Sequence, residues 1–206
     1  MRPDRPNGAC TRFIYTGAIG NVNELDTITD GFVTHAKRIQ NTVLDIYGDG
    51  PKRPAIQAKI DRIGMSDRVR FMGRIDRSQV PVELAASNWA VLGIANMPRL
   101  YSYGFSANKL TEYMAAGLPI CMVGDFPGNP VREHDAGLVV DGCSTSRIAD
   151  QFTDAHQAGW AAELGMGIHA QDFVRAQRLY ENYVPELAAA LDVSVRTSTV
   201  RGAKRT

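Results

Sequence analysis

Cysteine is scarce in this chain, and its spacing excludes two kinds of site. The 206 residues include three cysteines, and no two of them form a C-x-x-C pair. This pattern argues against a disulfide framework and a zinc site, and it is typical of a reduced, cytosolic protein. The four histidines also lie singly, on different segments: His35, His134, His156 and His169. We therefore expect them to be surface or core residues, and we expect no bound metal.

The chain also lacks a charge surplus and a long apolar run. Its formal net charge is +1, which argues against nucleic acid as a partner because duplex binders need a concentrated basic face. The longest charge-free run, Leu84 to Pro98, is too short and too polar to span a bilayer. Basic side chains gather only near the end, at Arg196, Arg201, Lys204 and Arg205. We expect residues 192–206 to form a disordered basic tail, with peripheral membrane contact as the alternative.

Three motifs of other enzyme classes are absent. The chain has no Asp-x-Asp pair, so nothing indicates a diphosphate held through a metal ion. Gly48-Asp49-Gly50 lacks the third glycine of the dinucleotide fingerprint and precedes Pro51, which argues against a Rossmann dehydrogenase and favours a plain turn. No Tyr-x-x-x-Lys pair is present either, which argues against a nucleotide-sugar epimerase.

After the first ten residues, short apolar runs alternate with longer helical patterns. This alternation predicts an α/β fold with a doubly wound, Rossmann-like parallel sheet over residues 11–191, following a leader at 1–10. The strands are expected at Arg12 to Tyr15, Val43 to Tyr47, Val69 to Met72, Ala90 to Ile94, Pro119 to Val123 and Leu138 to Val139. The helices are expected at Glu24 to Arg38, Pro54 to Ile63, Val80 to Ser87, Arg147 to Ala158 and Ala170 to Leu191.

One further segment, residues 103–119, reads as a helix built to hold an anion at its start. Ser106 is a good N-cap, so the amides of the first turn point outward with partial positive charge, and Lys109 adds a full charge. Asn108 and Glu112 lie four residues apart on one face of this helix. A diphosphate at the helix start would leave an attached ribose within reach of the Glu112 carboxylate. Gly117 ends the helix in the usual left-handed conformation.

Three other positions are candidates for ligand contact. The turn from Gly17 to Gly20 either cradles a phosphate or simply makes a tight turn, since glycine permits both. Gly73, Arg74 and Ile75 lie at the carboxyl end of a strand, where ligands of open α/β sheets bind. Arg99 precedes the helix described above. Its guanidinium either donates paired hydrogen bonds to the diphosphate or faces water.

The segment at 103–119 resembles the donor-side motif of the GT-B glycosyltransferases, in the large retaining family with an E-x7-E signature. Four other segments are similar to that family in order and spacing: residues 13–20, 46–51, 69–75 and 129–140. Together, roughly residues 11 to 185 match, which is far more specific than a lone glycine motif. The resemblance implies the C-terminal, donor-binding half of a GT-B enzyme.

The function that the resemblance implies is binding of a nucleotide-diphosphate sugar, such as a UDP-sugar, for glycosyl transfer to a saccharide or lipid-linked acceptor. Such enzymes of polysaccharide biosynthesis neutralise the leaving diphosphate with helix dipoles and basic side chains, so we expect no metal cofactor. The chain has about half the length of a complete enzyme. We therefore expect the acceptor-binding part to be supplied by a separate chain or by another subunit of a homo-oligomer. The alternatives are a split gene and a truncated chain.

The residue patterns and the resemblance together give ten candidate contacts for the sugar nucleotide: Gly17, Gly20, Gly73, Arg74, Ile75, Arg99, Ser106, Asn108, Lys109 and Glu112. Two features depart from the family pattern. Gly104 stands where the first glutamate, which contacts the donor sugar, is expected, and Ala18 and Asn23 stand at about the places of a diphosphate-binding arginine and lysine. No catalytic residue is assigned. The alternative is a catalytically silent nucleotide-sugar-binding or subunit-docking module.

Overall fold

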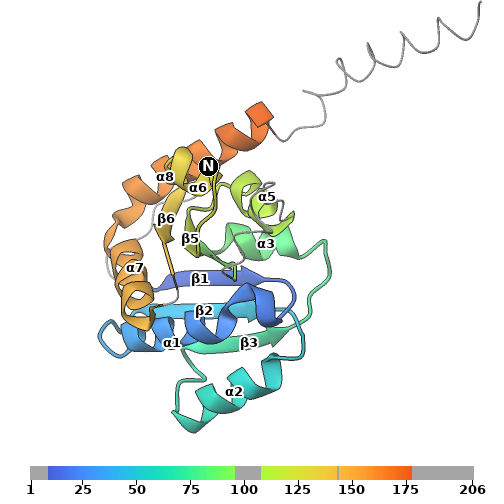
Figure 1. The fold of residues 1–206 in the computed structure, drawn as a ribbon, viewed down its shortest axis with the longest axis vertical. Coiled ribbons are helices and arrows are strands. Elements are labelled where there is room, and N and C mark those ends of the chain that lie inside the picture. The colour runs from blue at the N-terminus through green and yellow to red at the C-terminus, as the bar shows by residue number, and fades with distance from the viewer. Residues whose placement is uncertain (1–8, 96–107, 143, 178–206) are drawn as a thin grey trace, which may run out of the picture.

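The computed structural model describes residues 9–95, 108–142 and 144–177. Six parallel strands form one sheet in the order β3-β2-β1-β4-β5-β6 (Figure 1). Their bounds are β1 (Thr11–Thr16), β2 (Thr42–Tyr47), β3 (Val69–Gly73), β4 (Trp89–Gly93), β5 (Ile120–Val123) and β6 (Gly137–Val140). Because the strand order reverses between β1 and β4, the predicted doubly wound sheet is confirmed.

Helices cover both faces of the sheet, and each face has its own core. One core lies against α1 (Leu25–Ala36), α2 (Arg53–Arg62) and α7 (Thr145–Gln157). The other lies against α3 (Val80–Ala85), α5 (Asn108–Ala115), α6 (Pro130–Glu133) and α8 (Gly159–Gln177). A short 3-10 helix, η1 (Asn21–Asn23), connects β1 to α1. In Figure 1, α8 runs across the top of the molecule beside α6 and α5, while α1 and α7 lie together lower down.

The four inner strands are buried on both faces, which is why they read as largely apolar runs in the sequence. Every residue of β4 and β5 is buried. On the α1 side, the rings of Phe13, Phe32 and Phe152 meet edge to face, with centroids 4.9 to 5.8 Å apart. His35 packs beside Phe32, and its Nδ1 is 2.9 Å from Thr153 Oγ1. This histidine is therefore part of the core that joins α1 to α7.

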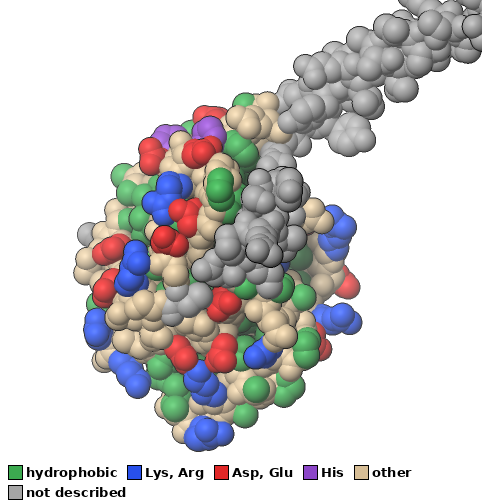
Figure 2. Space-filling model, viewed as in Figure 1, with side chains coloured by type: hydrophobic (Ala, Val, Ile, Leu, Met, Phe, Trp, Pro, Cys, Tyr) green, Lys and Arg blue, Asp and Glu red, His purple; other side chains and the backbone are tan. Residues whose placement is uncertain are grey.

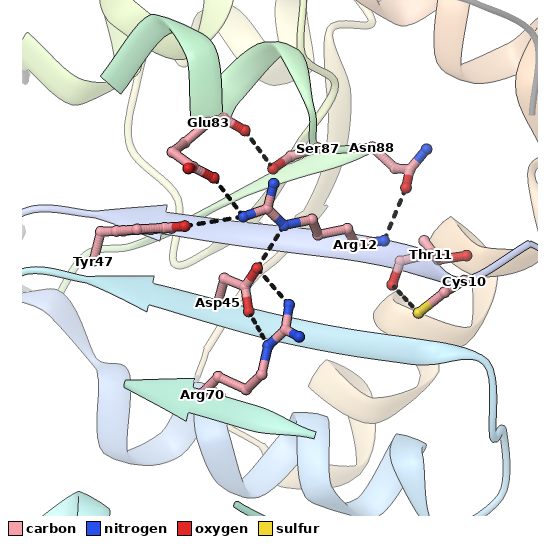
Figure 3. A network of polar contacts seen from close by, with 9 residues as sticks. All are labelled: Cys10, Thr11, Arg12, Asp45, Tyr47, Arg70, Glu83, Ser87 and Asn88. Carbon is pink, nitrogen blue, oxygen red and sulfur yellow. Dashed lines mark hydrogen bonds and ion pairs between the residues drawn. The ribbon is translucent and has the colours of Figure 1, made fainter. Parts of the chain in front are cut away.

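A network of charged side chains lies on the α3 side of β1, β2 and β3 (Figure 3). Asp45 is fully buried and accepts hydrogen bonds from both Arg12 and Arg70. The Arg12 guanidinium also donates to Glu83 of α3 at 2.6 Å and to the Tyr47 hydroxyl at 3.0 Å. Arg12 thus links α3 to the sheet, and a buried carboxylate of this kind is tolerated only because both arginines surround it.

The last helix differs from its prediction. It begins at Gly159, whereas the sequence predicted a start at Ala170. Two glycines, Gly165 and Gly167, lie inside the observed helix, although glycine is unfavourable in a helix interior. The structure gives a reason for one of them: a Cβ at Gly167 would lie 2.2 Å from the carbonyl oxygen of Gly117, where α5 ends. Residues from 178 onward lie outside the described part of the chain, so the domain limit at 191 and the tail at 192–206 stay predictions.

The close contact between α8 and the end of α5 gives a test of the fold. We expect Gly167→Ala to destabilise the protein by about 1 to 3 kcal/mol, because the new methyl group meets backbone that has no room to move. Gly165→Ala is the matched control, since nothing lies within 4 Å of its Cβ position. It should leave stability unchanged or raise it by up to about 1 kcal/mol. Urea unfolding measures both, and equal effects of the two substitutions would contradict the packing.

The surface carries both signs of charge. On the face shown in Figure 2, lysine and arginine side chains lie among aspartates and glutamates, so neither sign dominates this face. Of the helices in the described ranges, none combines the length and the apolar character that crossing a membrane requires.

Candidate functional site

A pocket of about 430 Å³ opens at the carboxyl ends of the central strands. Its walls come from the loops after β1, β2 and β3, from the first turn of α3 and from the start of α5. The residues that line it are Thr16, Gly17, Ala18, Tyr47, Gly48, Asp49, Arg74, Ile75, Arg77, Val80, Asn108, Lys109 and Glu112. This is the edge of an open α/β sheet at which ligands bind, next to the reversal of strand order.

Three glycines support the floor of the pocket, one at or just after the end of each neighbouring strand. The Gly17 amide donates to the Tyr47 carbonyl at 2.9 Å, and the Gly48 amide donates to the Gly73 carbonyl at 2.7 Å. All three glycines have positive φ angles, which other residues rarely adopt. A Cβ on Gly48 would lie 1.8 Å from the Gly17 carbonyl oxygen. The missing side chain of Gly48 therefore lets the turns after β1 and β2 pack against each other, and the missing side chain of Gly17 leaves room for Lys109.

Lys109 lies directly against this floor. Its Nζ lies 3.1 Å from the position that a Cβ on Gly17 would occupy. It donates to the Tyr15 hydroxyl at 2.7 Å and to Asn23 Oδ1 at 3.2 Å, and it sits 4.5 Å from the centroid of the Tyr15 ring. No carboxylate of the described residues lies within ion-pair distance of it. Burial lowers the pKa of Lys109 to about 8.

One wall of the pocket is formed by α5, the helix that carries Lys109, and by the loop after β3. Asn108 and Glu112, which the sequence placed on one face of the helix, both line the pocket. Glu112 Oε1 is 3.8 Å from the Arg77 guanidinium, which is almost fully exposed. The next residue, Tyr113, is fully buried, and its hydroxyl accepts from the Thr16 amide at 2.8 Å. This hydrogen bond fixes α5 against the end of β1 and so holds the Glu112 wall in place.

The far end of the pocket is more apolar. Ile75 and Val80 are half-buried there and lie on either side of the turn that leads into α3. Val80 opens α3, which the Arg12–Glu83 contact ties to the sheet. Arg74 is exposed and makes no ion pair within the described ranges. This end suits a flat, partly apolar group with polar edges.

The structure brings most of the predicted site residues together, with specific exceptions. Gly17, Arg74, Ile75, Asn108, Lys109 and Glu112 line the pocket. Gly20 and Gly73 do not; Gly20 precedes η1, and Gly73 supports Gly48 from behind. Arg99 and Ser106, like Gly104, lie outside the described residues.

Several lining residues were missed by the sequence reasoning. Gly48 and Asp49, interpreted as a plain turn, line the pocket, and so do Tyr47, Arg77 and Val80. A usable signal was present, because β1 and β2 are adjacent parallel strands and their ends meet at one edge. Extending the candidate list to the residues that follow every central strand would have included Gly48 and Asp49.

Comparison with known proteins identifies the family of the chain. A family model described as glycosyl transferases group 1 matches residues 10–158. The chain belongs to this family. It is also 28% identical over 170 residues to a GDP-mannose-dependent alpha-(1-6)-phosphatidylinositol monomannoside mannosyltransferase of Mycobacterium tuberculosis. That match covers 79% of this chain and 42% of the relative, so this group 1 chain spans less than half of the relative's length.

Solved structures confirm the fold of this group 1 chain as that of the GT-B glycosyltransferases. The C-terminal domain of a glycosyl transferase group 1 family protein from Francisella tularensis matches with a TM-score of 0.67 and 17% identity. The match covers 83% of this chain and 87% of that domain, so the two correspond over nearly their whole lengths. The pneumococcal O-GlcNAc transferase GtfA, solved with UDP and GlcNAc, matches with a TM-score of 0.73 and 14% identity, over 94% of this chain and 38% of that one.

Proposed function

We propose that this chain binds a nucleotide-diphosphate sugar in the pocket and forms the donor side of a retaining glycosyltransferase, with the acceptor bound by another domain or chain. The observation that carries the proposal is the partly buried Lys109 ammonium, which lines the pocket and whose partners among the described residues are all neutral. A buried charge without a counter-ion is costly, and an anionic ligand would compensate it. The nucleotides named for the mycobacterial relative and the pneumococcal neighbour support this assignment.

The shape of the pocket suggests how the donor would lie. The diphosphate would occupy the glycine floor beside Lys109 and the first amides of α5, where the helix dipole favours an anion. Glu112 would accept hydrogen bonds from the ribose hydroxyls, and the base would lie between Ile75 and Val80. Arg99, which lies outside the described residues, is proposed as a further diphosphate ligand.

In this proposal the protein contributes electrostatic stabilisation and no nucleophile. Negative charge develops on the diphosphate as the sugar–phosphate bond breaks, and Lys109 and the α5 amides face that charge before the reaction begins. No metal ion is needed for this step. The alternative is a silent nucleotide-sugar-binding module, which Gly104 favours because it stands where the first glutamate of the family pattern is expected. Glycosyl transfer by this chain with an acceptor-binding partner would exclude that alternative.

The proposed ribose contact is tested by Glu112→Ala. Hydrogen bonds to a charged group contribute about 1.5 to 3 kcal/mol, so affinity for UDP-glucose or GDP-mannose should fall by roughly ten- to a hundredfold. Glu133→Ala, at an exposed position on α6, is the matched control and should bind as the parent does. Isothermal titration also compares UDP with its 2′,3′-dideoxy form. If the Glu112 variant still distinguishes the two as well as the parent does, Glu112 does not bind the ribose.

The pH dependence of binding tests the role of Lys109. The anion favours the protonated ammonium, whose pKa in the free protein is about 8. Affinity for a nucleotide sugar should therefore be constant below pH 8 and fall as the pH rises above it, approaching tenfold per pH unit. Nucleotide sugars suit the measurement because their diphosphate does not titrate in this range. Lys109→Met should bind weakly with a flat profile between pH 6.5 and 9, and a flat profile in the parent would contradict the assignment.

Metal independence is tested by titrating the nucleotide sugar with and without EDTA. We expect the two dissociation constants to agree within about twofold, because an ammonium and backbone amides carry the phosphate charge. A loss of affinity beyond tenfold, about 1.4 kcal/mol, would show that a metal ion holds the diphosphate.

A further inference from the structure

The surroundings of the Lys109 ammonium are more specific than a buried lysine requires. An ammonium group has three N–H donors. Two of them are used, on the Tyr15 hydroxyl at 2.7 Å and on Asn23 Oδ1 at 3.2 Å. The third has no partner among the described residues, although the side chain is partly buried and lines the pocket.

The two acceptors are themselves held by a single carbonyl group. The Tyr15 hydroxyl donates to the Ala18 carbonyl at 2.6 Å, and Asn23 Nδ2 donates to the same oxygen at 2.8 Å. Because Nδ2 is used in this way, the amide of Asn23 must present its Oδ1 to Lys109. The arrangement explains why an amide suits position 23: an ionised carboxylate could not donate to Ala18, and it would cancel the charge of the ammonium.

Both acceptors also stay neutral. Burial raises the pKa of the Tyr15 hydroxyl, so it remains protonated over the whole physiological range. The Asn23 amide does not titrate. Lys109 is thus held in place by hydrogen bonds that leave its positive charge uncancelled.

We propose that Tyr15 and Asn23 are positioning residues, which hold the Lys109 ammonium above Gly17 with one N–H and its full charge left for the diphosphate of the donor. This inference rests on the proposed function, because it takes the ligand to be a nucleotide sugar. It goes beyond that function in assigning Asn23, which stands where a family lysine is expected, to orienting a cation supplied from α5. The cation and its two acceptors are preorganised for an anion, which avoids reorganisation when charge develops.

The sharpest test replaces the neutral acceptor with a charged one of the same size. Asn23→Asp places a carboxylate beside Nζ, so it should raise the pKa of Lys109 in the free protein, as read from the lysine side-chain NMR signals. The same variant should bind UDP-glucose and GDP-mannose about tenfold or more weakly at pH 7.5, since the charge is cancelled and the new carboxylate repels the diphosphate. Asn21→Asp, at an exposed position of the same 3-10 helix, is the matched control and should change affinity by less than about twofold.

Tyr15→Phe gives the opposite change at the same lysine. It keeps the ring but removes the hydroxyl acceptor, so the pKa of Lys109 should fall further and affinity at pH 8 should drop by roughly tenfold. Among the described residues, the other titratable groups that line this pocket are Tyr47 at the end of β2, Asp49 after β2, Arg74 and Arg77 after β3, and Glu112 on α5. None of them is altered by the two substitutions, so opposite pKa shifts with weaker binding in both variants identify Tyr15 and Asn23 as the cause.

The outcomes separate this inference from the function on which it rests. If the parent chain binds neither nucleotide sugar, the proposed function fails and the role of Lys109 as a diphosphate ligand fails with it. If the parent binds but Asn23→Asp leaves both the pKa of Lys109 and the affinity unchanged, the positioning inference alone is overturned. An equal loss of affinity in Asn23→Asp and Asn21→Asp would also overturn it, because the effect would then be one of general charge.

Discussion

The close approach of the β1, β2 and β3 ends is the constraint on which the site depends. Gly48 can lie against the Gly17 carbonyl only because it has no side chain, and both glycines adopt positive φ angles. This packing brings the turns after β1 and β2 into one continuous floor, which the Gly73 carbonyl supports from behind. A larger residue at Gly17 would also displace Lys109, so the same backbone geometry shapes the floor and sets the place of its cation.

Around this floor, polar groups are used in two different ways. Away from the pocket, Asp45 is buried between two arginines, which compensate its charge and tie α3 to the sheet. At the pocket, Lys109 has two hydrogen-bond acceptors but no opposite charge among the described residues. The first arrangement satisfies its charges internally and stabilises the wall that carries Val80. The second leaves a charge to be compensated from outside, which is what a binding site for a diphosphate requires.

The family membership and the geometry limit the function in complementary ways. Group 1 glycosyltransferases are the family of the chain, which shares its fold with a separately solved C-terminal domain and spans less than half the length of the mycobacterial enzyme. The family does not by itself say which residues of this chain meet the donor, because this sequence has Gly104, Ala18 and Asn23 where acidic and basic residues are expected. The structure offers a physical replacement for one of these losses: the ammonium of Lys109 reaches Asn23 from a different helix.

The sequence by itself determined the fold, because buried parallel strands give continuous apolar runs and helices give periodic ones. Both patterns are local, so they can be recognised in the sequence without knowing which elements pack together. It also placed Asn108, Lys109 and Glu112 on one helix and Gly117 at its end. It could not show that α8 begins at Gly159, since the glycine at 167 is explained only by its contact with Gly117. Nor could it show that Lys109 meets Tyr15 and Asn23, because a contact between residues some ninety positions apart is decided by how α5 packs against the end of β1.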